Sequence, residues 1–284
     1  MNGSIEQTAA PSSEQISESR KLLGNPYAYL NSSGTFSATM PPVRALANPA
    51  TTARNSKRHS NREIEKQANN LLKTMWKSRS TLWGDSPPSD PIVVIDPAKA
   101  LELCGFSFSY EEDLGKYHGD SGFLKVAGLI NADDKAVQVS NQFSQSIRMF
   151  TAAHELGHAV LHNVSGSVHR DRPVDGSSFS RESIEYEADK FATFFLMPAK
   201  LVRARFVEVF GTECFSLNED TAFALQCKPL HEIREKCRSL RDLSQLLASA
   251  GSYNGRFFPS LANQFRVSIE AMAIRLEELS LLEA

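Results

Sequence analysis

The chain has 284 residues, of which 41% are hydrophobic and 23% charged, and its formal net charge is -2. This composition excludes a wholly disordered protein, and the nearly balanced charge gives no overall electrostatic basis for binding nucleic acid or an anionic membrane. No apolar run approaches the roughly 18 residues of a membrane span, so no membrane partner is expected.

Residues 1–60 are predicted to form a flexible tail. They are rich in Ser, Ala, Asn, Thr and Pro, as in "NSSGTFSATMPP", and follow neither a helical nor a strand period. The start of the chain lacks a basic region followed by an apolar stretch, so no secretory signal is expected. The four cysteines are dispersed, without the close pairs of zinc knuckles or redox motifs. We therefore expect reduced cysteines and a cytoplasmic location.

Residues 61–140 are predicted to alternate between helices and short strands. "NREIEKQANNLLKTMWKSR" repeats apolar residues at three- and four-residue steps, which indicates a helix. "IVVI" (92–95) is predicted to be a short strand, and "DPAKALELCG" a short helix that Asp96 caps and Gly105 ends. "FSFSY" alternates like a strand, and Phe123 to Ser140 is predicted to be a hairpin around "NADDK".

Two longer helices are expected next, followed by a helical region. The first runs from about Ser144 to His162, and the second carries "IEYEADKFATFFLMP" and ends at Pro198. Residues 199–284 hold several amphipathic segments, of which the last forms two short helices about a turn at 266–268. This order of elements predicts an α+β domain at 61–198 and a helical C-terminal region at 199–284.

The stretch "FTAAHELGHAVLH" (150–162) points most directly to a chemistry. An α-helix turns about 100° per residue, so His154 and His158 lie about 40° apart in rotation and about 6 Å apart along the axis. Both imidazoles can therefore face one metal ion, with Glu155 beside them, close to a metal-bound water. This is the His-Glu-x-x-His arrangement of zinc peptidases. Zinc lowers the pKa of such a water to about 7, and Glu155 can take its proton and pass it to the leaving amine.

A metal-free, histidine-rich buried helix is the alternative interpretation. Two fixed histidines and a fixed glutamate arise by chance in roughly 1% of chains of this length, so the surroundings have to decide. Gly157 lies inside the helix, where glycine costs about 1 kcal/mol relative to alanine. A close neighbour, such as a strand bordering the cleft, would explain that glycine and favours the metal site.

The third ligand is expected from the second helix, in "ESIEYEAD". Glu185 and Asp189 lie four residues apart and share a face, whereas Glu187 points roughly the opposite way. In glutamate-type zinc peptidases, the third ligand is a Glu followed four residues later by an Asp that orients a ligating histidine. We therefore predict Glu185 as a ligand and Asp189 as the supporting carboxylate, with Glu187 as the alternative ligand.

His162 lies one turn beyond His158 and about 12 Å from His154 along the helix axis. It is expected to pack or hydrogen-bond below the site rather than to bind the same ion. The donor to the oxyanion is left open among four nearby side chains: Tyr186, His169, Arg170 and Arg172. The hairpin before the helix offers an edge to an extended peptide in one interpretation and is a protective hairpin in the other.

Together these segments resemble the ImmA/IrrE-type metallopeptidases. The resemblance rests on "FTAAHELGHAVLH", "EYEADKFATFFLMP" and the terminal "LANQFRVSIEAMAIRLEEL", and covers most of 61–198 and about 259–282. It implies an α+β fold, with a small zincin-like domain and a short antiparallel sheet, followed by helices. It also implies a zinc peptidase, often bacterial or on mobile elements, that cleaves helix-turn-helix repressors in stress or transfer responses. Carried over, His154, His158 and Glu185 would bind Zn²⁺ and Glu155 would be the catalytic base.

The chain departs from the family pattern in its long tail before residue 61 and in a longer segment at 199–258. Its terminal helix pair also resembles a helix-turn-helix. A DNA-reading helix should be basic or polar, but here Glu270, Glu277 and Glu278 stand against Arg275. We therefore expect this pair to have a structural or protein-docking role, and direct DNA binding is disfavoured.

The leading hypothesis is a cytoplasmic zinc endopeptidase whose partner is its protein substrate, a transcriptional repressor. A rival is a non-catalytic regulator that uses the metal-binding domain as a binding module, and it predicts a stable complex without cleavage. A third is a DNA-binding regulator acting through residues 259–280. The oligomeric state stays open, as does replacement of zinc by another divalent metal such as Mn²⁺.

Overall fold

A computed structural model describes residues 58–119, 122–162, 168–170, 179–226 and 229–283. Of the tail predicted at 1–60, only the last three residues fall in these ranges. Arg172 and the side chains of His169 and Arg170 lie outside the described residues, so their proposed part as oxyanion donors stays a prediction.

Helices and short strands alternate in the first part of the chain. In order they are α2 (Asn61–Lys77), α3 (Arg79–Trp83), α4 (Pro97–Leu103), β1 (Ser107–Glu111), β2 (Lys116–Gly119), β3 (Gly122–Lys125), β4 (Gly128–Asn131), β5 (Ala136–Ser140), α5 (Gln145–Leu161), β6 (Val168–Arg170) and α6 (Phe179–Leu196).

Helices dominate the second part. In order the elements are α7 (Ala199–Phe210), β7 (Phe215–Ser216), α8 (Glu219–Gln226), α9 (Leu230–Lys236), α10 (Leu240–Ser249), β8 (Ser252–Tyr253), β9 (Arg256–Phe257), α11 (Leu261–Phe265), α12 (Ile269–Glu278) and β10 (Leu282–Glu283).

The main sheet has the strand order β1-β5-β4-β6. β4 and β5 form a hairpin in which Gly128 lies opposite Val139, and β6 adds antiparallel to β4. β1 joins β5 in parallel, as the long connection through the β2–β3 ribbon allows. The predicted α+β class is therefore confirmed, but the sheet is mixed rather than wholly antiparallel.

Two predicted β segments differ from the structure. The hairpin is shorter than predicted, because the segment from Phe123 belongs to β3, which pairs with β2. The strand predicted at 92–95 is wrong: this segment is a turn, in which Asp90 accepts hydrogen bonds from the Ile92 and Val93 backbones. Ile92, Val94 and Ile95 are buried, whereas Val93 is 51% exposed. The Ile95 carbonyl accepts a hydrogen bond from the Arg266 guanidinium, so this carbonyl is satisfied without a neighbouring strand.

The helix starts follow from local capping. Ser60 accepts a hydrogen bond from the Glu63 backbone, and the Glu63 carboxylate accepts one from the Ser60 backbone, which fixes the start of α2. Asp96 accepts from the Ala98 and Lys99 backbones at the start of α4, as predicted. These side chains satisfy N–H groups that the first turn of a helix leaves unpaired.

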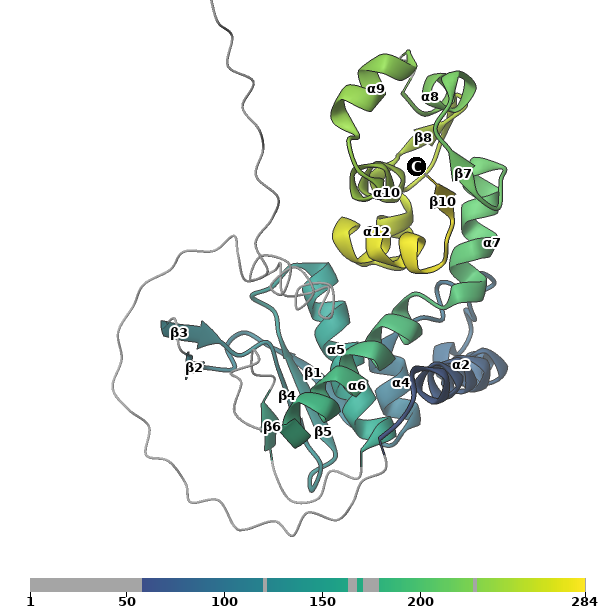
Figure 1. The fold of residues 1–284 in the computed structure, drawn as a ribbon. Coiled ribbons are helices and arrows are strands. Elements are labelled where there is room, and N and C mark those ends of the chain that lie inside the picture. Colours follow the sequence, from purple (N-terminus) through teal and green to yellow (C-terminus); the bar gives the residue numbers. More distant parts are fainter. Residues whose placement is uncertain (1–57, 120–121, 163–167, 171–178, 227–228, 284) are drawn as a thin grey trace, which may run out of the picture. The chain divides into compact units, whose positions relative to one another are not determined.

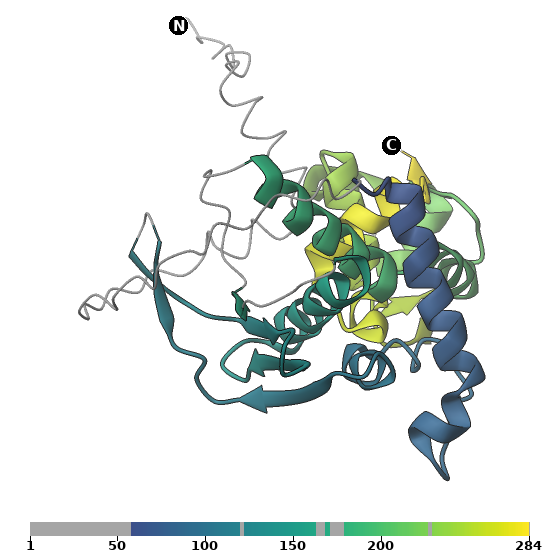
Figure 2. The ribbon, with the colours of Figure 1, turned by 90° about the horizontal axis from the view of Figure 1, so that it is seen from below.

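The helices lie in layers over the sheet. α5 packs on β4 and β5, and α6 packs on α5 (Figure 1). α2, the long dark-blue helix in Figure 2, packs in turn on α6. Leu156, Phe191 and Phe195 are completely buried between these layers, and the two phenylalanine rings stack with centroids 6.0 Å apart. α5 is thereby held between the sheet and a second helix, which positions its polar face.

The C-terminal helices pack on one another and on the end of α6. α10 packs on α11 and α12, and Arg266 turns the chain between those two short helices with a φ of 57°. The buried Arg275 of α12 donates from Nε to the Met197 carbonyl, 3.0 Å away, after the end of α6. Arg203 of α7 donates to the Leu279 carbonyl at 2.7 Å. Among the helices of the described ranges, none is both long and apolar enough to cross a membrane.

Candidate metal centre

The two helices that carry the motif residues approach closely at Gly157. A Cβ atom on this glycine would lie 3.0 Å from the Ala188 Cα atom, 3.1 Å from the Ala188 carbonyl oxygen and 3.2 Å from the Phe191 Cβ atom. The close neighbour expected for Gly157 therefore exists, but it is helix α6 rather than a strand. Ala188 stands three residues after Glu185, so this contact sets the distance between the helices next to the predicted ligands.

The side chains of His154, His158 and Glu185 converge in the structure. One donor atom from each lies within 4.8 Å of the others. The Nε2 atoms of the two histidines are 3.0 Å apart, and Glu185 Oε2 lies 3.2 Å from His154 Nε2 and 3.6 Å from His158 Nε2. Both histidines are buried, while the Glu185 side chain is 16% exposed. The cluster is thus enclosed by protein on the histidine side and reaches solvent at the carboxylate.

This donor set fits a zinc ion. Two ligands about 2.05 Å from a tetrahedral ion lie about 3.3 Å apart, and the three observed separations fall on both sides of this value. Two imidazoles and one carboxylate are also a common protein ligand set of catalytic zinc, with a fourth position left for water or substrate.

Glu155 is buried between α5 and β4. A Cβ atom placed on Gly128 of β4 would lie 3.1 Å from Glu155 Oε1 and 3.5 Å from its Cγ atom, and it would overlap the Thr151 methyl group. Because Gly128 has no side chain, the strand backbone can approach the carboxylate. Sequence patterns do not predict this contact, since the glycine lies 27 residues before Glu155.

Asp189 lies behind His154. Its Oδ1 atom is 2.9 Å from His154 Nδ1, so the ring nitrogen that faces away from the cluster has a carboxylate partner. Such a partner fixes the tautomer in which Nε2 carries the lone pair. This is the geometry that the predicted supporting role of Asp189 requires.

His158 has a histidine rather than a carboxylate as its partner on the side away from the cluster. The sequence predicted packing or a hydrogen bond of His162 below the site but not its contact with Glu187 or that of Glu187 with His59. His158 Nδ1 lies 3.1 Å from His162 Nδ1, so His162 hydrogen-bonds below the cluster. His162 Nε2 lies 3.4 Å from Glu187 Oε2, and that oxygen lies 2.7 Å from His59 Nδ1. Glu187, the alternative ligand, is therefore turned away from the cluster toward the start of α2.

The surroundings of His162 and Glu187 shift their pKa values. Burial lowers the pKa of His162, against the opposing effect of Glu187, and so favours the neutral ring. Burial alone would raise the pKa of Glu187, but hydrogen bonds from the His59 side chain and backbone and from His162 lower it overall. Glu187 is thus an ionised acceptor in a nearly enclosed position.

Two further expectations concern groups near the cluster. The Tyr186 hydroxyl lies 3.4 Å from the Asn61 side chain, so this candidate oxyanion donor is turned toward α2.

The outer edge of the hairpin is occupied along Leu129 to Asn131, because β6 pairs there. A peptide adding to the sheet at this side would have to pair beyond that segment or with β6.

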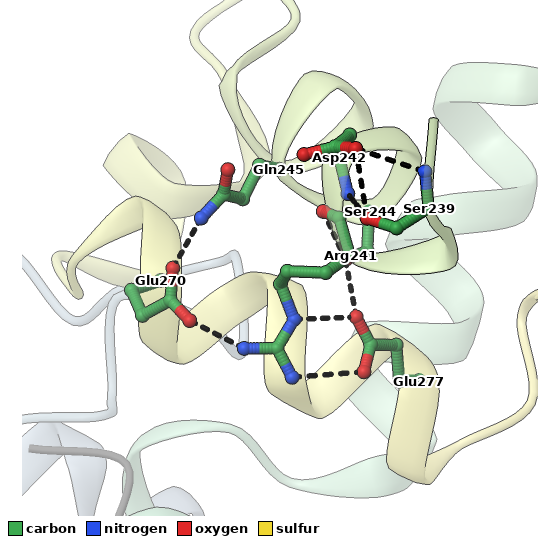
Figure 3. A network of polar contacts seen from close by, with 7 residues as sticks. All are labelled: Ser239, Arg241, Asp242, Ser244, Gln245, Glu270 and Glu277. Atoms are coloured by element: carbon green, nitrogen blue, oxygen red, sulfur yellow. Dashed lines mark hydrogen bonds and ion pairs between the residues drawn. The ribbon is translucent and has the colours of Figure 1, made fainter. Parts of the chain in front are cut away.

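The acidic residues of α12 are engaged within the protein. Arg241 of α10 forms two hydrogen bonds with Glu277, at 2.7 and 2.9 Å, and a further ion pair with Glu270 (Figure 3). Ser244 also donates to Glu277, at 2.5 Å, and Gln245 donates to Glu270. Glu278 pairs with Arg275 at 2.9 Å. The contacts of Glu270 and Glu277 bind α12 to α10.

No curated protein matches the chain. One solved structure, described as a Mycobacterium tuberculosis transcriptional regulator, is similar over 76% of this chain and 51% of its own chain, with 14% identity and a TM-score of 0.33. The chain thus spans about half the length of that protein.

Residues 110–212 match the family model of the IrrE N-terminal-like domain, which is a peptidase family. The match includes β4, α5 and α6, and therefore the whole His154, His158 and Glu185 cluster. The resemblance inferred from the motifs is therefore confirmed for residues 110–212, as a match to the IrrE N-terminal-like domain.

Proposed function

We propose that the chain is a zinc-dependent endopeptidase that hydrolyses peptide bonds of a protein substrate. The observation that carries the proposal is the convergence of His154 and His158 of α5 with Glu185 of α6. Glu155, the proposed base, lies on α5 beside the two histidines. The family match supports a peptidase, and the donor set supports zinc.

The residues of the cluster have distinct tasks in this proposal. His154, His158 and Glu185 would hold zinc, which when bound polarises the substrate carbonyl and makes a water more acidic. Glu155 takes a proton from the attacking water and delivers it to the nitrogen of the leaving amine. Asp189 holds His154 through Nδ1, 2.9 Å away, so that Nε2 stays directed at the cluster.

The position of Glu155 suits a general base. Its side chain is enclosed by α5 and by the β4 backbone at Gly128, so few rotamers are open to it. A carboxylate that is already placed loses little conformational freedom when the substrate and water arrive.

The substrate proposed from the family resemblance is a helix-turn-helix transcriptional repressor. The engaged carboxylates of α12 support a protein-directed rather than a DNA-directed role for the C-terminal helices. The cytoplasmic location expected from the sequence is part of the same proposal.

The test is to incubate the zinc-loaded protein with purified helix-turn-helix repressors and to identify products by mass spectrometry. Glu155→Gln keeps the shape of the side chain and should retain zinc while cleaving about 10²- to 10⁴-fold more slowly. Cleavage by this variant at nearly the normal rate would contradict the role of Glu155. A stable complex between the zinc-loaded normal protein and a repressor, without product, would instead support the binding-module hypothesis.

A further inference from the structure

We propose that His162 positions His158 for metal binding and that Glu187 and His59 hold His162 in place. This proposal rests on the proposed function, because it treats His158 as a metal ligand. It adds three positioning residues to the cluster, one of which precedes the first helix of the domain.

Consecutive contacts lead from His158 to the start of α2. His158 Nδ1 and His162 Nδ1 are 3.1 Å apart, His162 Nε2 and Glu187 Oε2 are 3.4 Å apart, and Glu187 Oε2 and His59 Nδ1 are 2.7 Å apart. The His59 backbone N–H also donates to Glu187 Oε1, at 3.1 Å. We refer to His162, Glu187 and His59 as the support chain.

The donors and acceptors of the support chain can be satisfied in one consistent order. A metal-binding Nε2 on His158 requires the proton of the neutral ring to be on Nδ1, which then donates to His162 Nδ1. His162 must accept at Nδ1, so its own proton is on Nε2 and is donated to Glu187. Glu187 is a carboxylate, and it accepts from His162 and from both N–H groups of His59.

The two histidine ligands therefore receive the same support by different routes. His154 contacts the carboxylate of Asp189 directly, whereas His158 reaches the carboxylate of Glu187 through the His162 ring. The Glu187 side chain is 5% exposed and that of Asp189 is 24% exposed. The more enclosed carboxylate makes its hydrogen bonds in a less polar environment, where they are stronger.

The support chain also connects the metal site to the beginning of the domain. His59 directly precedes Ser60, whose capping contacts with Glu63 fix the first turn of α2. A change in the backbone at residue 59 is therefore expected to reach His158 through Glu187 and His162.

The experiment measures the zinc affinity of the full chain by competition with a coloured chelator. His162→Phe keeps a planar ring but removes both nitrogens, and it should weaken zinc binding about 10- to 100-fold. His162→Asn places an amide oxygen near the position of Nδ1 and should bind zinc more tightly than His162→Phe. Glu187→Gln should reduce zinc affinity less than His162→Phe does, and His59→Ala should reduce it least, because these residues lie progressively further from His158 along the support chain.

Asn61→Ala is the matched control. Asn61 also joins the start of α2 to α6, through Tyr186, but it does not belong to the support chain. Its loss should leave zinc affinity unchanged. Urea unfolding of the metal-free proteins separates the roles further: a merely structural role of His162 predicts lower stability with normal zinc affinity, and that result would overturn the proposal.

Glu185→Ala distinguishes failure of this proposal from failure of the proposed function. If Glu185→Ala loses zinc while His162→Phe and His59→Ala bind it normally, the support chain is wrong and the metal site stands. If Glu185→Ala also binds zinc normally, the proposed metal site itself is wrong. Equal weakening of zinc binding by His162→Phe and His162→Asn would overturn the hydrogen-bonding role of His162.

Discussion

Two helix pairs in this protein are joined by polar side chains. They differ in whether a side chain of the protein supplies the cation that faces the carboxylates. In the α10–α12 pair, the Arg241 guanidinium lies between the carboxylates of Glu270 and Glu277. In the α5–α6 pair, two histidines and Glu185 direct nitrogen and oxygen atoms at one point. Imidazole nitrogens and carboxylate oxygens can offer lone pairs, so this cluster has the donor atoms that hold a metal ion rather than an ion pair between side chains.

The difference shows why a cluster of polar residues has to be judged by its donors and acceptors. Arginine supplies five N–H donors, and the Arg241 contacts are those of a structural ion pair. The α5–α6 cluster has the composition and the spacing of a metal site, together with a carboxylate or imidazole behind each histidine.

Removing a proposed ligand should have the largest effect. Glu185→Ala is expected to weaken zinc binding by more than about 100-fold, because one of three protein ligands is lost. Metal content after dialysis and chelator competition would measure it. The matched variant in the other helix pair, Glu270→Ala, should bind zinc normally; similar losses in both would show that zinc binding only reports general stability.

Removing the internal cation should destabilise the C-terminal helices. Arg241→Met leaves Glu270 and Glu277 facing each other, and we expect a loss of about 1–3 kcal/mol in the free energy of local unfolding. Hydrogen exchange of the α10 and α12 amides would measure this loss, with zinc affinity unchanged. Arg241→Lys keeps the charge but cannot bridge both carboxylates in the same way, so intermediate protection is expected; full protection would argue against the bridging geometry.

Separating the α5 and α6 backbones should weaken metal binding without removing any ligand. Gly157→Val introduces a side chain where even a Cβ atom would lie 3.0 Å from the Ala188 Cα atom, so the helices have to shift. We expect zinc affinity to fall by about tenfold, as ligand geometry is disturbed. Gly211→Ala, at the C-terminal end of α7, changes a glycine elsewhere and should leave the affinity unaltered. Normal zinc binding by Gly157→Val would show that the helix separation is not critical.

Lowering the pH should weaken the contacts between α10 and α12, and this is the smallest of the expected effects. Burial opposes ionisation of Glu277, but hydrogen bonds from Arg241 and Ser244 lower its pKa overall below the usual 4.5. Its stabilising contribution is therefore complete above about pH 4.5 and is lost as the pH falls through the lowered value. Hydrogen exchange of the α12 amides between pH 6 and pH 3.5, corrected for intrinsic rates, would measure it. Glu277→Gln should remove this part of the pH dependence.

Local patterns in the sequence predicted the elements that depend on local physics. The helical spacing of His154 and His158, the Asp96 cap and the Arg266 turn all involve residues within one or two helical turns. The prediction of a strand at Ile92 to Ile95 failed because a short β-branched run indicates that most of its side chains are buried, as three of the four are here, and not how its backbone is paired. Whether such a run is a strand depends on a neighbouring backbone, and here Asp90 and Arg266 supply the partners instead.

The sequence by itself determined the chemistry of the candidate site, because the ligand types and their periodicity are encoded in two short helical segments. Only the tertiary structure decided which surfaces meet. Gly157 faces a helix rather than a strand, and Gly128 leaves room for the Glu155 side chain. Glu187 hydrogen-bonds to His59, which lies 128 residues away in the chain. These contacts join residues that are far apart in sequence, and they follow from the packing of whole helices and strands rather than from the pattern of any one segment.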